Sequence, residues 1–316
     1  MSAVPASAPA HGWSKDLRTL LGDVADEFEV AELRNEAPLG TVRQTGFART
    51  RQPGVICLAM NRDYFAQAKD NSCARAIIAP PAVAGAEELS DKTLIVCGCA
   101  EELYLHLHAE QLPDAEEDVL DIHDSAMIDA SAVVRGRVRI EAGARIGPRV
   151  VISGPAVVRQ DVRIDAGAII GCDGLYAKTI RGRRLHMPHF GGVEIGEGAY
   201  VHAGAVVMRS AIRREATLIG KGTHIGVMVN VGHDAEIGDG ATVSSHGVIA
   251  GRAQIGARAR VGASATVSNA IRVGEGARVR LGAVVVRDVP AGASVSGNFA
   301  IDHARTLRNY LKEAGP

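Results

Sequence analysis

The sequence predicts a left-handed parallel β-helix preceded by a small α/β domain, and three features of its second half predict the β-helix. Ile or Val recurs at every sixth residue from Ile128 to Ile170 and again from Ile195 to Val285, with Arg213 as the one exception. Ala stands two positions before most of these residues, and Gly often follows them directly. A branched inward residue, a small residue and a turn-permitting Gly suit short flat strands joined by sharp corners, whereas a helix would need a spacing near 3.6.

Three such hexapeptides make one triangular coil of about 18 residues, so the eight plus sixteen repeats predict about eight coils. The composition agrees, because 36 of the 316 residues are Gly and only 3% are aromatic, which leaves Ile, Val and Ala to build the core. We place the β-helix at residues 116–299. An excursion at 171–193 interrupts it, since the step from Ile170 to Ile195 is 25 residues. Loops that leave a rigid solenoid commonly carry binding groups.

The residues before the repeats are predicted to form a disordered N-terminus at 1–12, rich in Ala, Pro and Ser, and an α/β domain at 13–115. In that domain helix-like segments alternate with short apolar runs. The segments are 17–28, 64–69 and 101–111, and the runs are 54–59, 74–79 and 93–97. The acidic stretch 113–124 is predicted to be a linker, and 300–316 a terminal helix that covers the last coil.

The overall composition argues against several classes of function. The net charge of -1 gives no electrostatic reason to expect a nucleic acid or an anionic membrane surface as partner. The five cysteines lack metal-ligand spacing, which favours buried free thiols in a cytoplasmic protein. No apolar stretch reaches the length of a membrane span, and the N-terminus lacks the apolar core of a signal peptide.

The histidines of the β-helix decide which chemistry it could support. His202, His224 and His246 follow one another at intervals of 22 residues and fall at different phases of the hexapeptide, so we expect them not to stack on one edge. A zinc enzyme on this fold would need three converging histidines. We therefore expect no metal site.

His233 differs from the other histidines because it lies two residues after the inward Val231, near a corner. One and two coils later the same phase holds Gly251 and Asn269, so the three should form a column. An imidazole beside a free backbone N–H is the arrangement that acyl transfer from a thioester requires. A histidine taken without regard to its position is more often a surface residue that forms a hydrogen bond at a turn than a catalytic base. Asp234 should point the other way along a strand and not orient His233.

Two segments carry a resemblance to a known family. Residues Pro53 to Tyr64 look like the segment Pro-Gly-x-(Ile/Leu)-(Ser/Thr)-Phe-x-x-Asn-x-x-Tyr of the UDP-3-O-acylglucosamine N-acyltransferases of lipid A biosynthesis, and residues 45–300 resemble that family as a whole. In the family the aromatic residues of this segment hold uracil. Asn61 and Tyr64 are retained here, whereas Leu58 replaces the family's Phe and removes a stacking face.

The resemblance continues in the β-helix. The run 171–174 resembles the family's Gly-Ser-Asp-Gly, 187–189 its Ile-Pro-Gln, and 231–234 its Ile-Ala-His-Asn. The last match implies that His233 is the catalytic base and that the Gly251 N–H stabilises the oxyanion. A second family histidine is replaced by Ala270. Gly232-His233-Asp234 also resembles the Gly-His-Asp of sugar acetyltransferases that use acetyl-CoA.

The resemblance therefore implies an N-acyltransferase that acts on a nucleotide-linked amino sugar, as in lipopolysaccharide synthesis. It would take its acyl group from a thioester of acyl carrier protein or coenzyme A, hold no bound cofactor, and work as a homotrimer with sites between subunits. Besides His233 and Gly251, the expected substrate-binding residues are Asn61, Tyr64, Asp173, Gly174, His189, Asn230 and His246.

Each secondary assignment has a plainer alternative. Asp173-Gly174 is also an ordinary turn pair, and His189 could serve only the fold of its loop. The run of Arg181, Arg183 and Arg184 is more typical of a solvated surface, although guanidinium groups also bind phosphate. Two other functions stay open: an acetyl-CoA-dependent sugar N-acetyltransferase for surface polysaccharide, and a non-catalytic sugar-binding scaffold.

Overall fold

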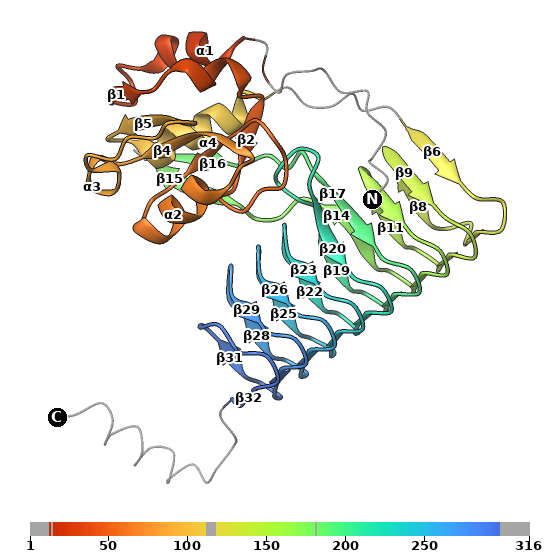
Figure 1. Cartoon of the computed structure of the whole chain (residues 1–316). Helices are drawn as coiled ribbons and strands as arrows, with labels where there is room; N and C mark the ends of the chain where they lie inside the picture. The colour runs from red at the N-terminus through yellow and green to blue at the C-terminus, as the bar shows by residue number, and fades with distance from the viewer. Residues whose placement is uncertain (1–12, 14, 112–117, 181, 298–316) are drawn as a thin grey trace, which may run out of the picture.

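The computed structural model describes residues 13, 15–111, 118–180 and 182–297, which form an α/β unit beside one flank of a long β-helix (Figure 1). The segments predicted as a disordered N-terminus (1–12) and a C-terminal helix (300–316) lie outside the described residues. No helix of the described part is both long and apolar enough to cross a bilayer.

The α/β unit is built on a five-stranded sheet of order β1-β5-β4-β3-β2, parallel except for β1. Its strands are β1 (Val30–Arg34), β2 (Gln44–Gly46), β3 (Val55–Leu58), β4 (Ala74–Ala79) and β5 (Thr93–Cys97). Its helices are α1 (Leu17–Val24), η1 (Ala37–Thr41), α2 (Arg62–Asp70), α3 (Pro81–Ala84) and α4 (Ala100–Ala109). The three apolar runs expected from the sequence are the central strands, and the three expected helices are α1, α2 and α4. The short strands β1 and β2 carry too few apolar residues to be predicted.

The loop after β3 matters for the site. Asn61 is the N-cap of α2, and its Oδ1 accepts a hydrogen bond from the Tyr64 N–H at 2.9 Å. An Asn cap satisfies one of the backbone donors that open a helix, so the Asn-x-x-Tyr spacing has a local structural cause. The same turn places the Tyr64 ring against the apolar core beside the sheet.

The described residues from 118 to 297 form a left-handed parallel β-helix with three flat sheets. The first sheet contains β6 (Val119–Ile122), β9 (Arg137–Ile140), β12 (Ala156–Val158), β17 (Gly192–Ile195), β20 (Ala216–Ile219), β23 (Glu236–Ile237), β26 (Gln254–Ile255) and β29 (Arg272–Val273). The second contains β7 (Met127–Ile128), β10 (Arg145–Ile146), β13 (Arg163–Ile164), β18 (Tyr200–Val201), β21 (His224–Ile225), β24 (Thr242–Val243), β27 (Arg260–Val261), β30 (Arg278–Val279) and β32 (Ser294–Val295). The third contains β8 (Val133–Arg135), β11 (Val151–Ser153), β14 (Ile169–Cys172), β19 (Val206–Met208), β22 (Asn230–Val231), β25 (Val248–Ile249), β28 (Thr266–Val267) and β31 (Val284–Val285).

The strand register confirms the hexapeptide prediction. Val231 pairs with Ile249, and Ile249 with Val267, so residues 18 apart stack coil upon coil. Their side chains, with the other inward aliphatic residues and the Ala two positions before them, form one buried core along the solenoid. The linker prediction for 113–124 is wrong in its second half, because β6 pairs with β9 and begins the β-helix. Its acidic residues misled the prediction, since the sheet leaves them outside.

Both interruptions of the repeat fall at the same edge of the β-helix, where a strand of the third sheet is followed by the next strand of the first sheet. We call this edge the third corner. The ordinary step there is six residues, as from Val231 to Ile237. It lengthens to 25 at the excursion and to 12 between Val207 and Ile219. Arg213, the exception to the repeat, therefore lies in a six-residue insertion and occupies no repeat position.

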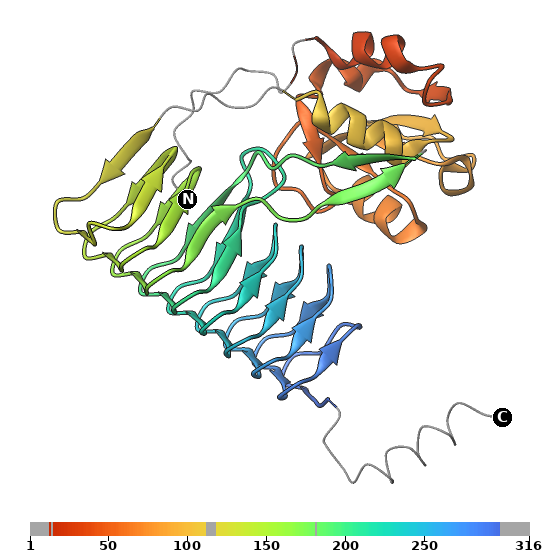
Figure 2. The same cartoon turned by 180° about the vertical axis from the view of Figure 1, so that it is seen from behind.

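These two additions join the β-helix to the α/β unit. The excursion contains the antiparallel hairpin β15 (Ala177–Ile180) and β16 (Arg183–His186), which reaches across to the α/β unit (Figure 2). Met187 from the excursion and Ile212 from the insertion pack in one apolar cluster with Leu103 and Tyr104 of α4. The third corner thus supplies apolar contacts between the two units, and Arg51 adds an ion pair with Glu236 of the first sheet.

Candidate active site

His233 lies at the third corner between β22 and β23, and only 7% of the residue is exposed. Its carbonyl accepts the Arg252 N–H at 2.8 Å, and a Cβ built on Gly251 would lie 2.7 Å from its Nε2. One coil further, the Ala270 N–H donates to the Gly251 carbonyl at 3.0 Å. The predicted column of His233, Gly251 and Asn269 is confirmed, and the imidazole lies directly over the glycine.

Asp234 does contact His233, which corrects the expectation that it points away. Its Oδ2 lies 2.7 Å from His233 Nδ1. The expectation treated the two residues as alternating positions of a strand, but Asp234 is in a turn with φ +59°, in the left-handed region. Both side chains therefore project to the same side of the chain.

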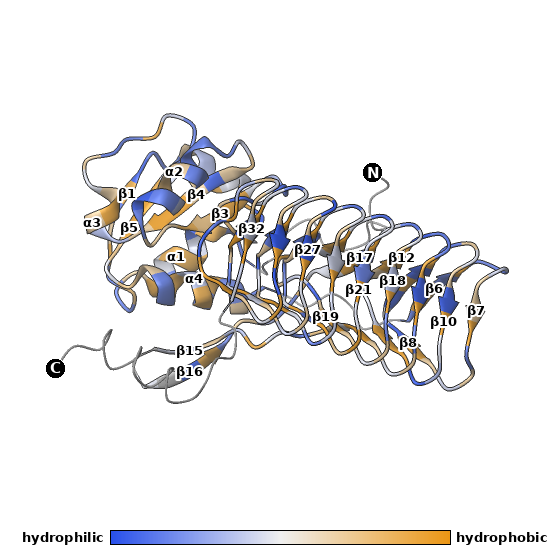
Figure 3. Ribbon diagram, turned by 90° about the horizontal axis from the view of Figure 1, so that it is seen from below, coloured by the Kyte–Doolittle hydropathy of each residue, from blue (hydrophilic) through white to orange (hydrophobic). Residues whose placement is uncertain are grey.

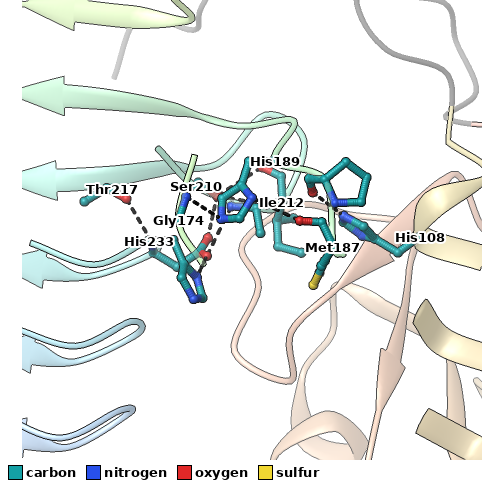
Figure 4. A network of polar contacts seen from close by, with 11 residues as sticks. His108, Gly174, Met187, His189, Ser210, Ile212, Thr217 and His233 are labelled. Atoms are coloured by element: carbon teal, nitrogen blue, oxygen red, sulfur yellow. Dashed lines mark hydrogen bonds and ion pairs between the residues drawn. The ribbon is translucent and has the colours of Figure 1, made fainter. Parts of the chain in front are cut away.

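The carboxylate of Asp234 is held by the six-residue insertion. Ser210 Oγ donates to its Oδ1, and the Ala211 N–H donates to its Oδ2 at 3.2 Å. Its own N–H donates to Thr217 Oγ1 at 2.8 Å (Figure 4). Because a carboxylate only accepts hydrogen bonds, Nδ1 of His233 carries the proton of that bond and Nε2 presents a lone pair toward Gly251. A histidine oriented in this way by a carboxylate is suited to act as a general base.

The excursion covers the imidazole of His233. His189 is buried, and its ring stands edge-on to that of His233 with 5.3 Å between centroids. Its Nδ1 donates to the Met187 carbonyl at 3.1 Å, and its Nε2 accepts the Gly174 N–H at 3.3 Å. Burial, and then the charge that His233 carries when protonated, lower the pKa of His189. His189 therefore stays neutral and holds the excursion in place over His233.

A second buried histidine links this loop to the α/β unit (Figure 4). His108 Nε2 donates to the Pro188 carbonyl at 2.8 Å, and its Nδ1 accepts from Thr45 Oγ1 at 2.5 Å. Burial lowers the pKa of His108 to about 4. A neutral imidazole thus fixes the loop segment next to His189, one contact away from the His233 ring.

Tyr176 was not among the residues predicted for the site. Its ring meets the edge of His233 with 5.4 Å between centroids, and burial raises its pKa. Its hydroxyl forms no hydrogen bond with any described residue. No periodic signal marks Tyr176, and only its position within the excursion could have suggested it.

A cavity of about 440 Å³ opens beside this group, between the α/β unit and the β-helix. Ligand sites of small molecules usually have about 300–1,000 Å³. The predicted residues Asn61 and Tyr64 line it, as do Leu58 and Ala270, the two positions that depart from the family pattern. Further lining residues come from both units: Phe47, Arg49, Tyr104, Tyr176, Lys178, Glu215, Asp234, Glu236, Arg252 and Gln254.

Of the remaining predicted residues, only Gly174 joins His233. A Cβ on Gly174 would lie 3.2 Å from His233 Cδ2, so the chain passes against the imidazole there. Asp173 is exposed and pairs with Arg209 Nε at 2.7 Å. Asn230 lies on the outer side of β22, and His246 is exposed at the corner between the second and third sheets. None of these three lines the cavity.

His202 and His224 lie closer than expected, with 5.9 Å between ring centroids. The six-residue insertion lengthens the coil between them, so that Tyr200 pairs with His224 and brings His202 alongside. Among the described residues, no three His, Cys, Asp or Glu side chains form a group that could hold a metal ion.

Neither a protein-family model nor a curated protein matches the sequence. Solved structures with a similar fold include the UDP-N-acetylglucosamine acyltransferase of Francisella novicida, at 24% identity over 63% of this chain and 73% of that one, with a TM-score of 0.48. The UDP-N-acetylglucosamine O-acyltransferase of Moraxella catarrhalis is 23% identical over 60% of this chain and 77% of its own, with a TM-score of 0.39. Likeness of this degree does not identify a reaction, so the chemistry rests on the geometry of the site.

Proposed function

We propose that the protein is an acyltransferase that moves an acyl group from a thioester to the amine of a nucleotide-linked amino sugar. The observation that carries this proposal is the His233–Asp234 pair, whose Nε2 faces a glycine beside a cavity large enough for a small-molecule substrate. A base of this kind can activate an amine without a metal or a covalent enzyme intermediate.

In the proposed reaction, the amine nitrogen attacks the thioester carbonyl carbon while His233 Nε2 accepts a proton from the amine. The carbonyl oxygen becomes an oxyanion in the tetrahedral intermediate. The Gly251 N–H, which donates to no acceptor among the described residues, would stabilise it. The C–S bond then breaks, the amide forms, and the imidazolium returns its proton to the leaving thiolate. Asp234 holds the imidazole in the required tautomer and stabilises its positive charge.

The cavity would bind the nucleotide. Tyr64 and Phe47 offer aromatic faces for a base, and Asn61 lies beside them. Leu58 provides an apolar wall in place of a further aromatic ring. The donor would be a thioester of acyl carrier protein or of coenzyme A, with no cofactor retained between turnovers. The five cysteines are free thiols, which is consistent with a cytoplasmic enzyme.

We also propose a homotrimer in which the third sheet faces a neighbouring copy. Its outward row is mostly apolar, in contrast to the second sheet, and Figure 3 shows hydrophobic residues along β8 and β19. The outward row of the third sheet is Val133, Val151, Ile169, Val206, Asn230, Val248, Thr266 and Val284. The matching row of the second sheet includes Arg145, Arg163, Arg260 and Arg278. Because His233 lies at one edge of the third sheet, a partner there would border the site.

The test is release of free thiol by purified protein. UDP-, GDP- and dTDP-linked amino sugars are each paired with acetyl-CoA and with 3-hydroxyacyl carrier protein, and wild type is compared with His233→Ala. We expect release that needs both substrates and falls by about 10²–10⁴-fold in the variant, the usual contribution of a general base. The carrier-protein pairs test the reaction of lipid A synthesis, and the acetyl-CoA pairs test the acetyltransferase.

His246→Ala is the matched control, since this histidine is exposed at another corner of the same fold. Its rate should stay within a factor of two of wild type, because His246 does not line the cavity. Full activity in a folded His233→Ala protein would reject His233 as the general base, and no thiol release from any pair by folded wild type would favour a sugar-binding scaffold.

A further inference from the structure

Two arginine side chains line the cavity without facing a carboxylate partner among the described residues. Arg49, in the loop after β2, donates from Nε to Gln67 Oε1 at 2.8 Å and from Nη1 to Gln254 Oε1 at 3.5 Å. Arg252, next to Gly251 at the third corner, lies over the Phe47 ring with 5.0 Å from its Cζ to the ring centroid. Both guanidinium groups thus contact neutral groups and no carboxylate among the described residues.

Most of the other charged groups of the cavity wall form ion pairs or hydrogen bonds with described residues. Lys178 pairs with Glu101, and Glu236 accepts from Arg51 at 2.8 Å. Glu215 accepts from Thr50 Oγ1 and the Arg51 N–H. Asp234 is engaged by His233, and Asp63 lies in the first turn of α2, at the end of the cavity near Asn61. The two arginines are therefore the cations of the wall that remain without a carboxylate.

Arg252 also has an unmet hydrogen-bonding capacity. Its Nε is buried and has no partner. Its Nη2 donates to the Asn269 side-chain oxygen at 2.6 Å, in the amide orientation that also lets Asn269 donate to the Gly251 carbonyl at 2.5 Å. An anionic ligand in the cavity would form charge-assisted hydrogen bonds with the part of this guanidinium group that lines it.

The positions of the groups follow the order of the parts of a nucleotide-linked sugar. Asn61 and Tyr64 stand at the α/β side of the cavity, where the base would lie. Arg252 follows Gly251 directly and donates its N–H to the His233 carbonyl, so it stands where the cavity meets the general base. The group that joins the base to the reacting sugar would therefore lie in a cavity whose wall carries both guanidinium groups.

We propose that Arg49 and Arg252 bind the diphosphate of a nucleoside diphosphate-linked substrate, one arginine from each unit of the chain. This assignment rests on the proposed function for the identity of the attached sugar, but the binding itself does not require turnover. Guanidinium groups pair with phosphate through two parallel hydrogen bonds, and Arg252 would keep its contact with Phe47 while doing so. The diphosphate would then draw the α/β unit and the β-helix together and fix the sugar beside His233.

The experiment measures binding by calorimetry, with UDP, GDP and dTDP and with the corresponding nucleosides uridine, guanosine and thymidine. For the nucleotide that binds wild type, we expect Arg252→Gln to weaken the diphosphate by about 10–100-fold, the loss of one charged hydrogen-bonding partner of about 1.5–3 kcal/mol. Binding of the nucleoside should stay within a factor of two. Arg49→Gln should act in the same direction with a smaller loss, because Arg49 is the more exposed of the two.

Lys178→Gln is the matched control, since Lys178 lines the same cavity but is already paired with Glu101. It should leave both affinities unchanged. Arg252→Lys keeps the charge and loses the planar pair of donors, so its affinity for the diphosphate should fall between wild type and Arg252→Gln. Thermal unfolding of each variant shows whether the fold is retained.

Three results would overturn the assignment: no binding of any nucleoside diphosphate to wild type, an equal loss for nucleoside and diphosphate in Arg252→Gln, or no loss at all. Failure of the acyltransferase proposal gives a different pattern. In that case thiol release is absent while the diphosphate still binds through the two arginines, which would leave this assignment standing for a binding protein.

Discussion

The third corner of the β-helix and the other two corners share one backbone geometry, yet only the third carries a candidate active site. At each corner the third residue after the inward aliphatic position can have a positive φ. This angle is near +60° for Asp234 and Arg252 at the third corner, and also for His246 and Ser264 at the corner between the second and third sheets. What differs is the extra chain. Only the third corner has the excursion and the insertion, and these bury His233, whereas His246 is exposed at the corner between the second and third sheets.

The regular solenoid therefore orients the base, and the two interruptions supply the groups that surround it. The left-handed turn at Asp234 places its carboxylate beside the ring of His233. Ser210 and Ala211 of the insertion then fix the carboxylate, and Gly174 and His189 of the excursion cover the imidazole.

The largest effect in this comparison is expected for Asp234→Asn. Asn tolerates the positive φ and keeps the shape of the side chain, but it removes the charge that stabilises the imidazolium and can present its NH₂ group to Nδ1. We expect kcat/KM to fall by about 10²–10⁴-fold, as when the carboxylate of a catalytic triad becomes an amide. Steady-state thiol release measures this loss.

Asp161→Asn is the matched control. Like Asp234, Asp161 is the third residue after an inward aliphatic residue, and its φ is +56°. It is exposed at the corner between the first and second sheets. Its replacement should change neither turnover nor the unfolding temperature. Unchanged activity in Asp234→Asn would mean that the hydrogen bond to Nδ1 has no part in the reaction.

Gly251→Ala should have the next largest effect. The new Cβ would lie 2.7 Å from His233 Nε2, so the imidazole must move. The fold itself accepts a side chain at this phase, because the positions one and two repeats later are Ala257 and Ala263. We therefore expect kcat/KM to fall by about 10–10³-fold, since small displacements of a catalytic group cost this much. Stability should change by less than about 1 kcal/mol.

Activity and thermal unfolding measured on the same Gly251→Ala preparation separate the two effects. A matched loss of stability and activity would show that Gly251 is required by the coil. Full activity would show that the imidazole does not need its place over the glycine, and would contradict the proposed oxyanion site.

The fold was predictable because one rule governs most of it. A β-branched residue at every sixth position determines which side chains point inward, and the register then predicts the column of His233, Gly251 and Asn269. Asp234 was assigned wrongly because strand alternation was applied across a turn. Tyr176 and Arg252 were missed for another reason. The path of the excursion and its contacts with the α/β unit depend on packing between distant segments, which no periodicity records.

His108 provides the smallest of the expected effects and tests how the excursion is attached. The pKa of this buried imidazole is about 4 in the folded protein and about 6.5 in the unfolded chain. Between these values the unfolded chain binds the proton and the folded protein does not, so the contribution of His108 to stability is complete above pH 6.5 and declines as the pH falls toward 4. The free energy of unfolding should therefore decline by roughly 2 kcal/mol between pH 7.5 and pH 5 because of His108.

The variant His108→Gln can still donate to the Pro188 carbonyl but cannot titrate. Chemical unfolding at the two pH values should therefore show a smaller change in the free energy of unfolding for the variant than for wild type, by that amount. An equal pH dependence in both proteins would mean that His108 is protonated without breaking its contact with the loop, and that the cover over His233 does not depend on a neutral imidazole.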